Sequence, residues 1–322
     1  MSLLRVDDLK VDYLAADGAV RAVDGVGFTL ERGEILGLVG ESGSGKSTAA
    51  MAVMRILGPP ALISGGEVRY EDRDVLGMSA GELRRWHWRE ISIVMQSALN
   101  ALNPVLTVRE HFSDTLGAHK PGLSKPAARE HAAGLLKMVD IDPRHLGSYP
   151  HELSGGMRQR VVIALALALD PPLLIMDEPT TALDVVVERE ILNRVLQLQK
   201  KTGFSILFIT HDLSLLLEFA TRLGVLYAGR LVEIGPASIF RNGGMHPYTQ
   251  GLLQAVPQLH GERGAFRSIP GSPPSLKNPP KGCRFHPRCP LAEERCRCEQ
   301  PRLEEAAPGH RVACHLCPAA PR

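Results

Sequence analysis

The sequence predicts an α/β fold with a buried, mostly parallel sheet, and three short stretches carry this prediction. Ile35–Val39, Ile91–Met95 and Leu173–Met176 are largely apolar runs, a pattern typical of strands that are covered on both faces. Each run ends in glycine or polar residues, which in such sheets face the ligand crevice at the carboxyl ends of the strands. With 322 residues, the chain has room for one large α/β domain and a smaller appendage.

The first run leads into a glycine-rich stretch, Gly40–Thr48, that fits the phosphate-binding pattern G-x-x-x-x-G-K-[ST]. Residues 48–57 have helical composition, so a strand, a glycine-rich turn and a helix follow in the expected order. Backbone N–H groups of the turn and the positive end of the helix would hold phosphate oxygens. Lys46 would reach the β- and γ-phosphates, and Ser47 would supply a hydroxyl to Mg²⁺. The alternative is a flexible loop before an ordinary helix. The predicted nucleotide contacts are Gly40, Ser42, Gly43, Ser44, Gly45, Lys46, Ser47 and Thr48.

The chain ahead of this loop predicts an antiparallel hairpin. Residues 3–12 and 26–37 alternate or run apolar on either side of Asp17-Gly18, which is a turn signal. Tyr13 lies at the end of the first predicted strand, where its ring would stack on an adenine, an interaction of ~1–3 kcal/mol. Packing of the ring against the core explains the same residue equally well.

Polar side chains follow three of the predicted strands. Gln96 would hold Mg²⁺ or the attacking water through its amide, or it simply ends its strand. Asp177 would hold Mg²⁺ through the water shell of the ion, and Glu178 would orient and deprotonate a water aimed at the γ-phosphate. His211 follows the strand predicted over 205–210 and would contact the γ-phosphate. The alternatives are two solvated acids and a polar edge histidine.

A second glycine-rich turn lies further along the chain. Residues 98–152 are helical segments punctuated by proline and glycine, which we interpret as an inserted helical subdomain. Leu153–Gln159 follows, and Ser154 is a good N-cap for the Ala/Leu/Val helix after it. Gly155 and Gly156 leave backbone N–H groups exposed at that helix start, so the turn predicts a second anion site. A plain glycine loop before a helix is the alternative.

Composition narrows the class of protein. The net charge of +2 gives no reason to expect a nucleic-acid partner. The longest apolar run, Val161–Leu169, is far shorter than the ~20 residues that span a bilayer, and no targeting segment is evident. All 6 cysteines lie within Cys283–Cys317, too local for a disulfide framework of the whole protein. The chain from Pro270 onward is rich in proline and has too few apolar residues for a core, so it needs a staple or must dock onto the main domain.

These motifs together resemble the nucleotide-binding subunits of ABC transporters over nearly the whole chain. In that resemblance Gly40–Thr48 is the Walker A motif, Gln96 the Q-loop, and Tyr13 the adenine-stacking position. The other matches are Leu153–Gln159 with the signature motif, Leu173–Asp177 with Walker B, Glu178 with the catalytic carboxylate, Ala182–Asp184 with the D-loop and His211 with the switch histidine. The signature carries Met157 where glutamine is usual, a substitution common in importers of this kind.

The resemblance implies a P-loop ATPase with a RecA-like core, an N-terminal antiparallel β-subdomain and an inserted helical subdomain at about 97–158. It also implies that two such subunits sandwich two ATP molecules head to tail. Ser154, Gly155 and Gly156 of one subunit would then complete the γ-phosphate site of the other, with Asp184 as a further nucleotide contact. A lone subunit should therefore hydrolyse ATP poorly.

The C-terminal segment resembles the tail of oligopeptide/dipeptide permease ATPases, on the evidence of His246–Thr249 and Cys283–Pro290. We therefore expect an ABC domain over residues 1–265 and a small Cys- and Pro-rich domain over 266–322. The resemblance implies that Cys283, Cys289, Cys296 and Cys314 are the ligands of a [4Fe–4S] cluster. Thiolates alone suit either Fe–S or Zn²⁺, and the spacing of five, six and seventeen intervening residues is not a usual zinc-finger pattern. Cys298 and Cys317 are additional, and free cysteines are the alternative.

The resemblance also implies the function and the partners. The leading hypothesis is an ATPase at the cytoplasmic face of a prokaryotic membrane, powering peptide uptake with ATP and Mg²⁺. Its partners would be two integral-membrane permease subunits, a second ABC ATPase subunit (a paralogue or another copy) and an extracellular or periplasmic substrate-binding protein. Nickel or oligosaccharide import, a soluble ABC ATPase acting on DNA or ribosomes, and a redox-sensing Fe–S protein are the rival hypotheses.

Overall fold

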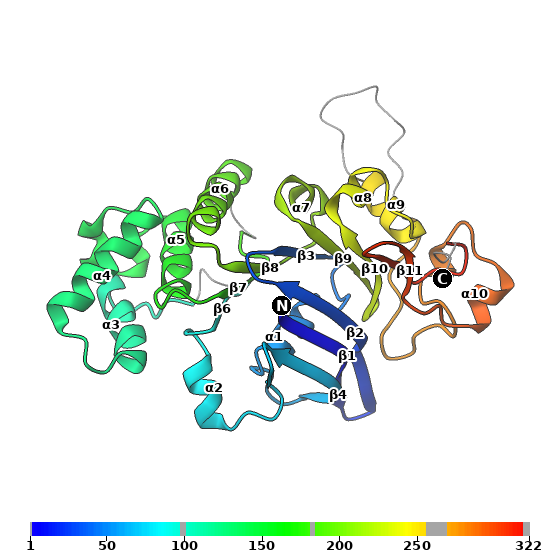
Figure 1. The fold of residues 1–322 in the computed structure, drawn as a ribbon, viewed down its shortest axis with the longest axis horizontal. Helices are drawn as coiled ribbons and strands as arrows, with labels where there is room; N and C mark the ends of the chain where they lie inside the picture. Colours follow the sequence, from blue (N-terminus) through cyan, green and yellow to red (C-terminus); the bar gives the residue numbers. More distant parts are fainter. Residues whose placement is uncertain (1, 97–100, 181–183, 256–268, 318–322) are drawn as a thin grey trace. The chain divides into compact units, whose positions relative to one another are not determined.

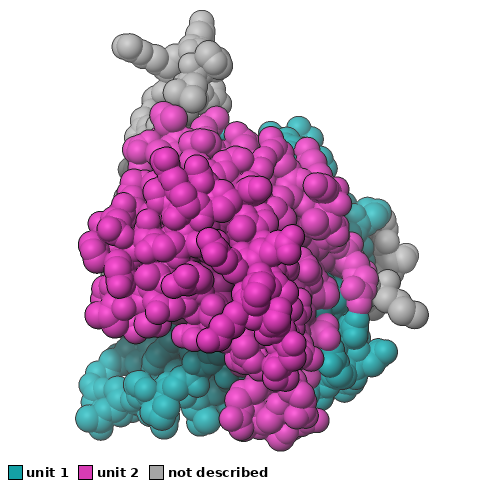
Figure 2. Space-filling view, turned by 90° about the vertical axis from the view of Figure 1, so that its left-hand side faces the viewer, with its two compact units in different colours: residues 1–30, 35–76, 209–322 teal, residues 31–34, 77–208 magenta. Residues whose placement is uncertain are grey.

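The computed structural model describes residues 2–96, 101–180, 184–255 and 269–317 (Figure 1). They form two compact units, coloured separately in Figure 2. Unit 1 comprises residues 1–30, 35–76 and 209–322, and unit 2 comprises residues 31–34 and 77–208. The predicted domain boundary after residue 265 lies outside the described residues and stays a prediction, as does the predicted helical insertion at 97–158.

The N-terminal part of unit 1 is an antiparallel sheet with the strand order β2-β1-β4-β5. Its strands are β1 (Ser2–Ala15), β2 (Gly18–Glu31), β4 (Ala61–Tyr70) and β5 (Arg73–Asp74). Neighbouring β1 and β2 confirm the hairpin predicted around Asp17-Gly18. The stretch predicted as its second arm, 26–37, instead holds parts of two strands, because a turn with Gly33 at φ 71° separates them.

A second group of strands in unit 1 carries the glycine-rich loop and receives the C-terminal segment. Its order is β11-β12-β10-β9-β3, for β3 (Ile35–Val39), β9 (Arg222–Tyr227), β10 (Arg230–Pro236), β11 (Glu304–Ala307) and β12 (His310–Val312). β3 runs parallel to β9, and β12 runs antiparallel to β10 with Glu233 opposite Val312. The C-terminal segment therefore docks by adding strands, which is one of the two possibilities, a staple or docking, that its scarcity of apolar residues predicted.

The helices of unit 1 are short. They are α1 (Lys46–Val53), α7 (Leu213–Phe219), α8 (Ala237–Arg241), α9 (Pro247–Gln254), α10 (Glu294–Cys298) and the 3₁₀ helix η4 (His286–Arg288). α1 ends before the predicted Leu57 because Arg55 adopts φ 51°, a left-handed conformation that no α-helix continues through.

Unit 2 joins buried strands to a group of helices. Its strands follow the order β8-β7-β6, for β6 (Ile91–Val94), β7 (Leu173–Asp177) and β8 (Ser205–Thr210), the last of which crosses the unit boundary. Its helices are α2 (Ala80–Trp86), α3 (Val108–His119), α4 (Lys125–Met138), α5 (Gly155–Ala166), α6 (Val185–Thr202), η2 (Pro143–Gly147) and η3 (Pro150–Glu152). Helix α4 buries Ala132, Leu135 and Leu136. No described helix combines the length and hydropathy needed to cross a bilayer.

Candidate nucleotide-binding site

The glycine-rich stretch Gly40–Thr48, called the phosphate loop below, follows the buried strand β3 in unit 1. It begins at a point where only glycine fits. A Cβ on Gly40 would fall on the carbonyl oxygen of Leu226, and a Cβ on Gly45 would fall on that of Ala22. Gly45 is also the N-cap of α1, in the left-handed region at φ 98°. The loop therefore wraps against its own unit with no room for side chains at these two positions.

Lys46 begins α1 and is 5% exposed. Its Nζ donates to the carbonyl oxygens of Gly40 at 2.7 Å and Glu41 at 3.0 Å, and to Ser44 Oγ at 3.3 Å. The Lys46 amine is thus held by residues of its own loop, close to the start of α1. A fixed cation beside the exposed N–H groups of a helix start is an arrangement suited to a polyphosphate.

Tyr13 lies at the end of β1, against the first turn of α1. Its hydroxyl is 3.3 Å from Thr48 Oγ1, and the side chain is half-buried. One edge of the ring is therefore tied to the phosphate-loop helix while part of its surface stays accessible. Stacking on adenine stays a prediction.

Two predicted residues of unit 2 meet because their strands are in register. β6 and β7 are parallel with Val94 opposite Met176, so Gln96 and Glu178 each lie two residues beyond a paired position. Gln96 Nε2 donates to Glu178 Oε2 at 2.8 Å, which brings the predicted water-orienting amide onto the predicted base. Asp177, the last residue of β7, is 3% exposed.

Glu178 has a backbone conformation that the sequence did not reveal. Its φ is 44°, in the left-handed region that non-glycine residues rarely occupy. Such a conformation costs about 1–3 kcal/mol and is often found where function dictates the direction of a side chain. Here it turns the chain immediately after the buried strand, at the residue whose carboxylate meets Gln96.

The second glycine-rich turn begins α5 as predicted. Ser154 is exposed, and its Oγ accepts the backbone N–H of Met157 at 3.2 Å, which makes it the N-cap. A Cβ on Gly156 would lie 2.8 Å from the side chain of Val187 in α6, so the two helices begin side by side. Asp184 caps α6 by accepting the N–H groups of Val186 and Val187. The preceding D-loop residues Ala182 and Leu183 lie outside the described residues.

His211 follows β8, as predicted, and is exposed. The next residue, Asp212, caps α7 by accepting the N–H groups of Ser214 and Leu215. The histidine therefore occupies the single residue between a buried strand and a capped helix, where its backbone position is well defined. Its contact with a γ-phosphate stays a prediction.

The four cysteines predicted as ligands gather in the C-terminal segment of unit 1. Cys283 N–H donates to the carbonyl of Cys296 at 2.9 Å. Burial raises the pKa of Cys283 to about 11, and the nearby Cys296, Cys314 and Cys289 raise it too. Among the described residues, however, no group of three or more His, Cys, Asp or Glu is arranged to hold a metal ion. The donor types suit a thiolate-bound centre, whereas their arrangement does not by itself form one.

The extra cysteines differ from these four. Cys298 is exposed and its thiol points to Glu294 on its own helix, at 3.8 Å, whereas Cys296 is buried. Cys317 Sγ lies 3.6 Å from the carbonyl of Met245. A hydrogen bond from the Cys317 side chain lowers the pKa of Cys314.

Sequence reasoning missed the residues that hold the phosphate loop from the C-terminal segment. Arg288 makes two hydrogen bonds to Glu41, the second residue of the loop. The Glu41 N–H donates to Tyr248 Oη at 2.9 Å. No local pattern could have indicated these pairings, since the partners lie more than two hundred residues apart; the only signal was the pair of arginines flanked by Cys283 and Cys289.

Two family models match the chain. The model described as ABC transporter matches residues 23–181, and the one described as oligopeptide/dipeptide transporter, C-terminal region, matches residues 232–296. The dipeptide transport ATP-binding protein DppD of Caldanaerobacter subterraneus subsp. tengcongensis is 44% identical, over 98% of this chain and 97% of that protein. The Escherichia coli protein of the same name is 41% identical over the same shares. A solved dimeric bacterial ABC transporter cassette superposes with a TM-score of 0.66 at 28% identity, covering 73% of this chain and 98% of its own.

The chain therefore belongs to the ABC transporter family of ATP-binding proteins, in its oligopeptide/dipeptide branch. The predicted fold class, an ABC-type P-loop ATPase with an antiparallel β-subdomain and helices, is confirmed. The predicted enzyme class, an ATPase, is confirmed as well.

Proposed function

We propose that this ATPase powers the import of dipeptides or oligopeptides through a membrane permease. The observation that carries the proposal is the match along the full length of proteins named for dipeptide transport, including the C-terminal segment. The relatives cited above bear no name that points to nickel, oligosaccharides or redox sensing. No observation here favours those alternatives or a soluble ATPase that acts on nucleic acid.

The proposed chemistry assigns hydrolysis to the strand ends of unit 2. Glu178 is the general base that deprotonates the attacking water, and Gln96 orients that carboxylate through its amide. Their 2.8 Å contact and the turned backbone of Glu178 support this assignment. Bound Mg²⁺ would neutralise charge on the phosphates, and the magnesium roles predicted for Ser47, Gln96 and Asp177 stay predictions.

The proposed binding of ATP rests on the phosphate loop of unit 1. Lys46 Nζ is positioned by the carbonyls of Gly40 and Glu41, so it is ready to receive phosphate oxygens. Tyr13 would cover the adenine and His211 would contact the γ-phosphate. The signature turn at Ser154, Gly155 and Gly156 would act on nucleotide held by a second ATPase subunit, either a paralogue or another copy of this chain.

The proposed partners follow from the branch to which the chain belongs. Two integral-membrane permease subunits would hold a pair of ATPase subunits at the cytoplasmic face of the membrane. A substrate-binding protein on the outside would deliver the cargo to that permease. The peptide length that is accepted would be set by those other proteins.

We propose further that Cys283, Cys289, Cys296 and Cys314 hold a [4Fe–4S] cluster, for which the gathering of four thiols is the support. Iron and acid-labile sulfide should each approach four per chain in anaerobically purified protein. Cys296→Ser should lower both, whereas the exposed Cys298→Ser should not. A colourless protein that contains one zinc per chain, or no metal, would contradict the proposal.

The function is tested by transport. The chain is reconstituted in lipid vesicles together with the permease subunits encoded by adjacent genes and a substrate-binding protein. Uptake of a radiolabelled dipeptide is then measured with and without MgATP. We expect uptake that needs MgATP and that disappears with Glu178→Gln. Full ATP-dependent uptake of nickel or oligosaccharide without uptake of any peptide would contradict the cargo, and purification with nucleic acid instead of membrane subunits would contradict the whole proposal.

A further inference from the structure

Glu41, in the phosphate loop, is held by residues that lie far away in the sequence. Its carboxylate accepts two hydrogen bonds from Arg288, Nη1 to Oε2 at 2.6 Å and Nη2 to Oε1 at 3.0 Å. Its backbone N–H donates to Tyr248 Oη at 2.9 Å, and its carbonyl accepts from Lys46 Nζ at 3.0 Å. Side chain, N–H and carbonyl are therefore all held, and the carbonyl is one of those that position the Lys46 amine.

Arg288 is itself fixed on every side. It is 6% exposed, its Nε donates to the carbonyl of Pro270 at 2.8 Å, and its guanidinium lies 5.8 Å from the centre of the Tyr227 ring. Phe285, three residues earlier, packs against Tyr227 and Tyr248 with ring centres 5.2 and 5.4 Å apart. A planar guanidinium that pairs with a carboxylate through two parallel bonds fixes both position and orientation, which a lysine cannot do.

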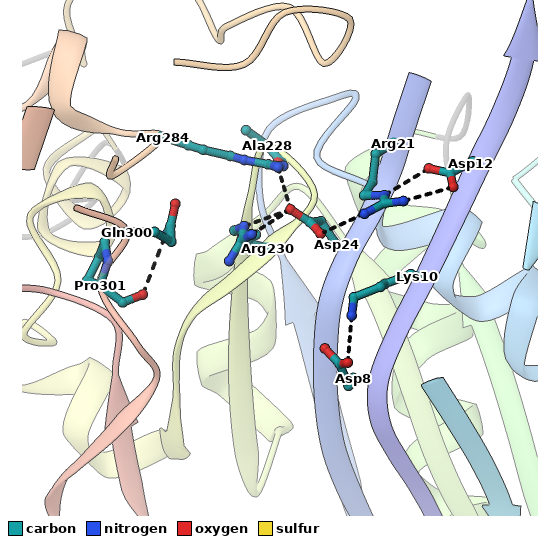
Figure 3. A network of polar contacts seen from close by, with 10 residues as sticks. All are labelled: Asp8, Lys10, Asp12, Arg21, Asp24, Ala228, Arg230, Arg284, Gln300 and Pro301. Carbon is teal, nitrogen blue, oxygen red and sulfur yellow. Dashed lines mark hydrogen bonds and ion pairs between the residues drawn. The ribbon is translucent and has the colours of Figure 1, made fainter. Parts of the chain in front are cut away.

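A second arginine of the same turn reaches the loop from another direction. Arg284 pairs with Asp24 and donates to the carbonyl of Ala228, as Figure 3 shows. The next residue, Gly229, donates its N–H to the carbonyl of Ser44 in the phosphate loop at 2.9 Å. Its own carbonyl accepts the N–H of Asp24 at 2.8 Å. Arg284 is therefore connected to the middle of the phosphate loop through the short turn Ala228-Gly229.

The network around Asp24 continues toward the predicted adenine position. Arg21 lies 3.8 Å from Asp24 and pairs with Asp12 at 2.9 Å (Figure 3). Asp12 directly precedes Tyr13 in β1. Arg284 and Arg288 both belong to the short segment 283–289, so one part of the C-terminal chain supports the phosphate loop from two directions.

We propose that residues 283–289 act as a clamp that positions the phosphate loop, so that the C-terminal segment sets the affinity of the same chain for MgATP. Arg288 is a positioning residue that acts through Glu41, whose carboxylate it pairs with and whose carbonyl accepts from Lys46 Nζ. Without it, Glu41 and the carbonyl that positions Lys46 lose their fixed place, and binding must supply the order that the clamp now provides. The inference rests on the proposed binding of ATP at the Lys46 loop.

The test measures the dissociation constant of MgATP for the full-length subunit, by displacement of a fluorescent ATP analogue, together with the melting temperature. We expect Arg288→Ala to weaken binding roughly tenfold, and Arg288→Lys to lie between this variant and the parent protein. Lys277→Ala is the matched control, because Lys277 also pairs the C-terminal segment with the N-terminal sheet, at Asp17, through an exposed ion pair. It should bind MgATP as the parent does.

Glu41→Gln separates positioning from general stability. It keeps the size of the side chain but loses the charged pair, so it should weaken the binding of MgATP and leave the melting temperature unchanged. The double variant with Arg288→Ala should bind MgATP no more weakly than Arg288→Ala by itself. This variant also covers the case in which Arg288→Ala fails to fold. Parent affinity in Arg288→Ala or in Glu41→Gln, equal loss in Lys277→Ala, or independent effects that multiply in the double variant would overturn the clamp. A parent protein that does not bind MgATP would instead overturn the proposed function.

Discussion

The phosphate loop and the signature turn are both glycine-rich turns ahead of a helix, yet the chain holds them in opposite ways. The loop buries Ser44 and Lys46, and the Lys46 amine turns back onto its own carbonyls. The signature turn leaves Ser154 exposed, with its Oγ capping α5. The phosphate loop is held by contacts within its own unit, which suits a site that binds nucleotide in the same chain. The exposed signature turn is accessible to nucleotide that is bound by a second subunit. We infer that the same local pattern serves two purposes, and the predictions below test this distinction together with the groups around the two turns.

The largest effect is expected at the end of β7, where we propose that the chemistry takes place, and not at either turn. Glu178→Gln keeps a hydrogen bond with Gln96 possible but removes the proposed base, so ATP turnover should fall by roughly 10²–10⁴-fold. MgATP binding should persist, and closed dimers should accumulate. Steady-state hydrolysis by the assembled complex measures the turnover, and size-exclusion chromatography with ATP detects the closed dimers. Glu190→Gln, which alters a partly exposed pair with Arg160, is the control, and equal hydrolysis by Glu178→Gln and parent would remove Glu178 from the catalytic role.

The next effect separates the two turns by affinity. Lys46→Ala deletes the cation that we propose faces the phosphates, so the dissociation constant of MgATP for the isolated subunit should rise roughly a hundredfold. Isothermal titration calorimetry measures it. Undiminished affinity would show that the buried lysine does not contact the nucleotide.

A smaller, different effect is expected at the signature turn. Ser154→Asp retains an N-cap but places a negative charge where a phosphate would come, whereas Ser154→Ala removes the cap at a cost of about 1 kcal/mol. Both should leave the affinity of the isolated subunit for MgATP unchanged. Only Ser154→Asp should abolish hydrolysis by the assembled pair while it keeps the parent melting temperature. A weakened affinity of the isolated subunit would mean that the turn acts within its own chain.

The smallest effect concerns acid and the support beneath the phosphate loop. His246 caps α9, the helix that carries Tyr248, and burial lowers the pKa of His246 to about 4. Between its ordinary value near 6.5 and about 4, the unfolded chain binds a proton that the folded chain does not, so stability falls as the pH falls through this window. The difference corresponds to roughly 3 kcal/mol at most.

Glu233 acts in the same direction at lower pH. Burial raises the pKa of its carboxyl, but hydrogen bonds from His310 and from the N–H groups of Met245 and His246 outweigh burial and hold the pKa below its ordinary value. Its stabilisation is therefore present above about pH 4.5 and lost below. Urea unfolding at several pH values checks both groups. His246→Asn keeps a capping side chain without a titrating ring and should flatten the dependence between pH 6.5 and 4; an unchanged slope would exclude His246.

Local patterns in the sequence were enough for the elements that carry the site. The run Ile35–Val39 and the cap at Ser154 were predicted correctly because burial and capping leave signatures a few residues long. The proximity of Gln96 and Glu178 could have been predicted from the sequence, since both were predicted to follow parallel strands. Their direct hydrogen bond required the register of those strands, which no apolar run specifies.

Two kinds of feature lay beyond sequence reasoning. The left-handed backbone of Glu178 is imposed by its surroundings, because glutamate has no intrinsic preference for that conformation. The pairing of Arg288 with Glu41 joins residues from opposite ends of the chain, and an arginine beside a cysteine motif has many possible partners. The C-terminal segment also pairs β12 with β10, whereas the sequence predicted only that this segment needs a staple or must dock.

The central claim is that the braced loop of one subunit and the open turn of its mate enclose one triphosphate. The most direct measurement is a structure of the assembled transporter with a non-hydrolysable ATP analogue. We predict that Ser154 Oγ of one ATPase subunit lies within about 3 Å of the γ-phosphate bound at the lysine-bearing loop of the other. A signature turn that stays remote from any nucleotide in that assembly would contradict the account.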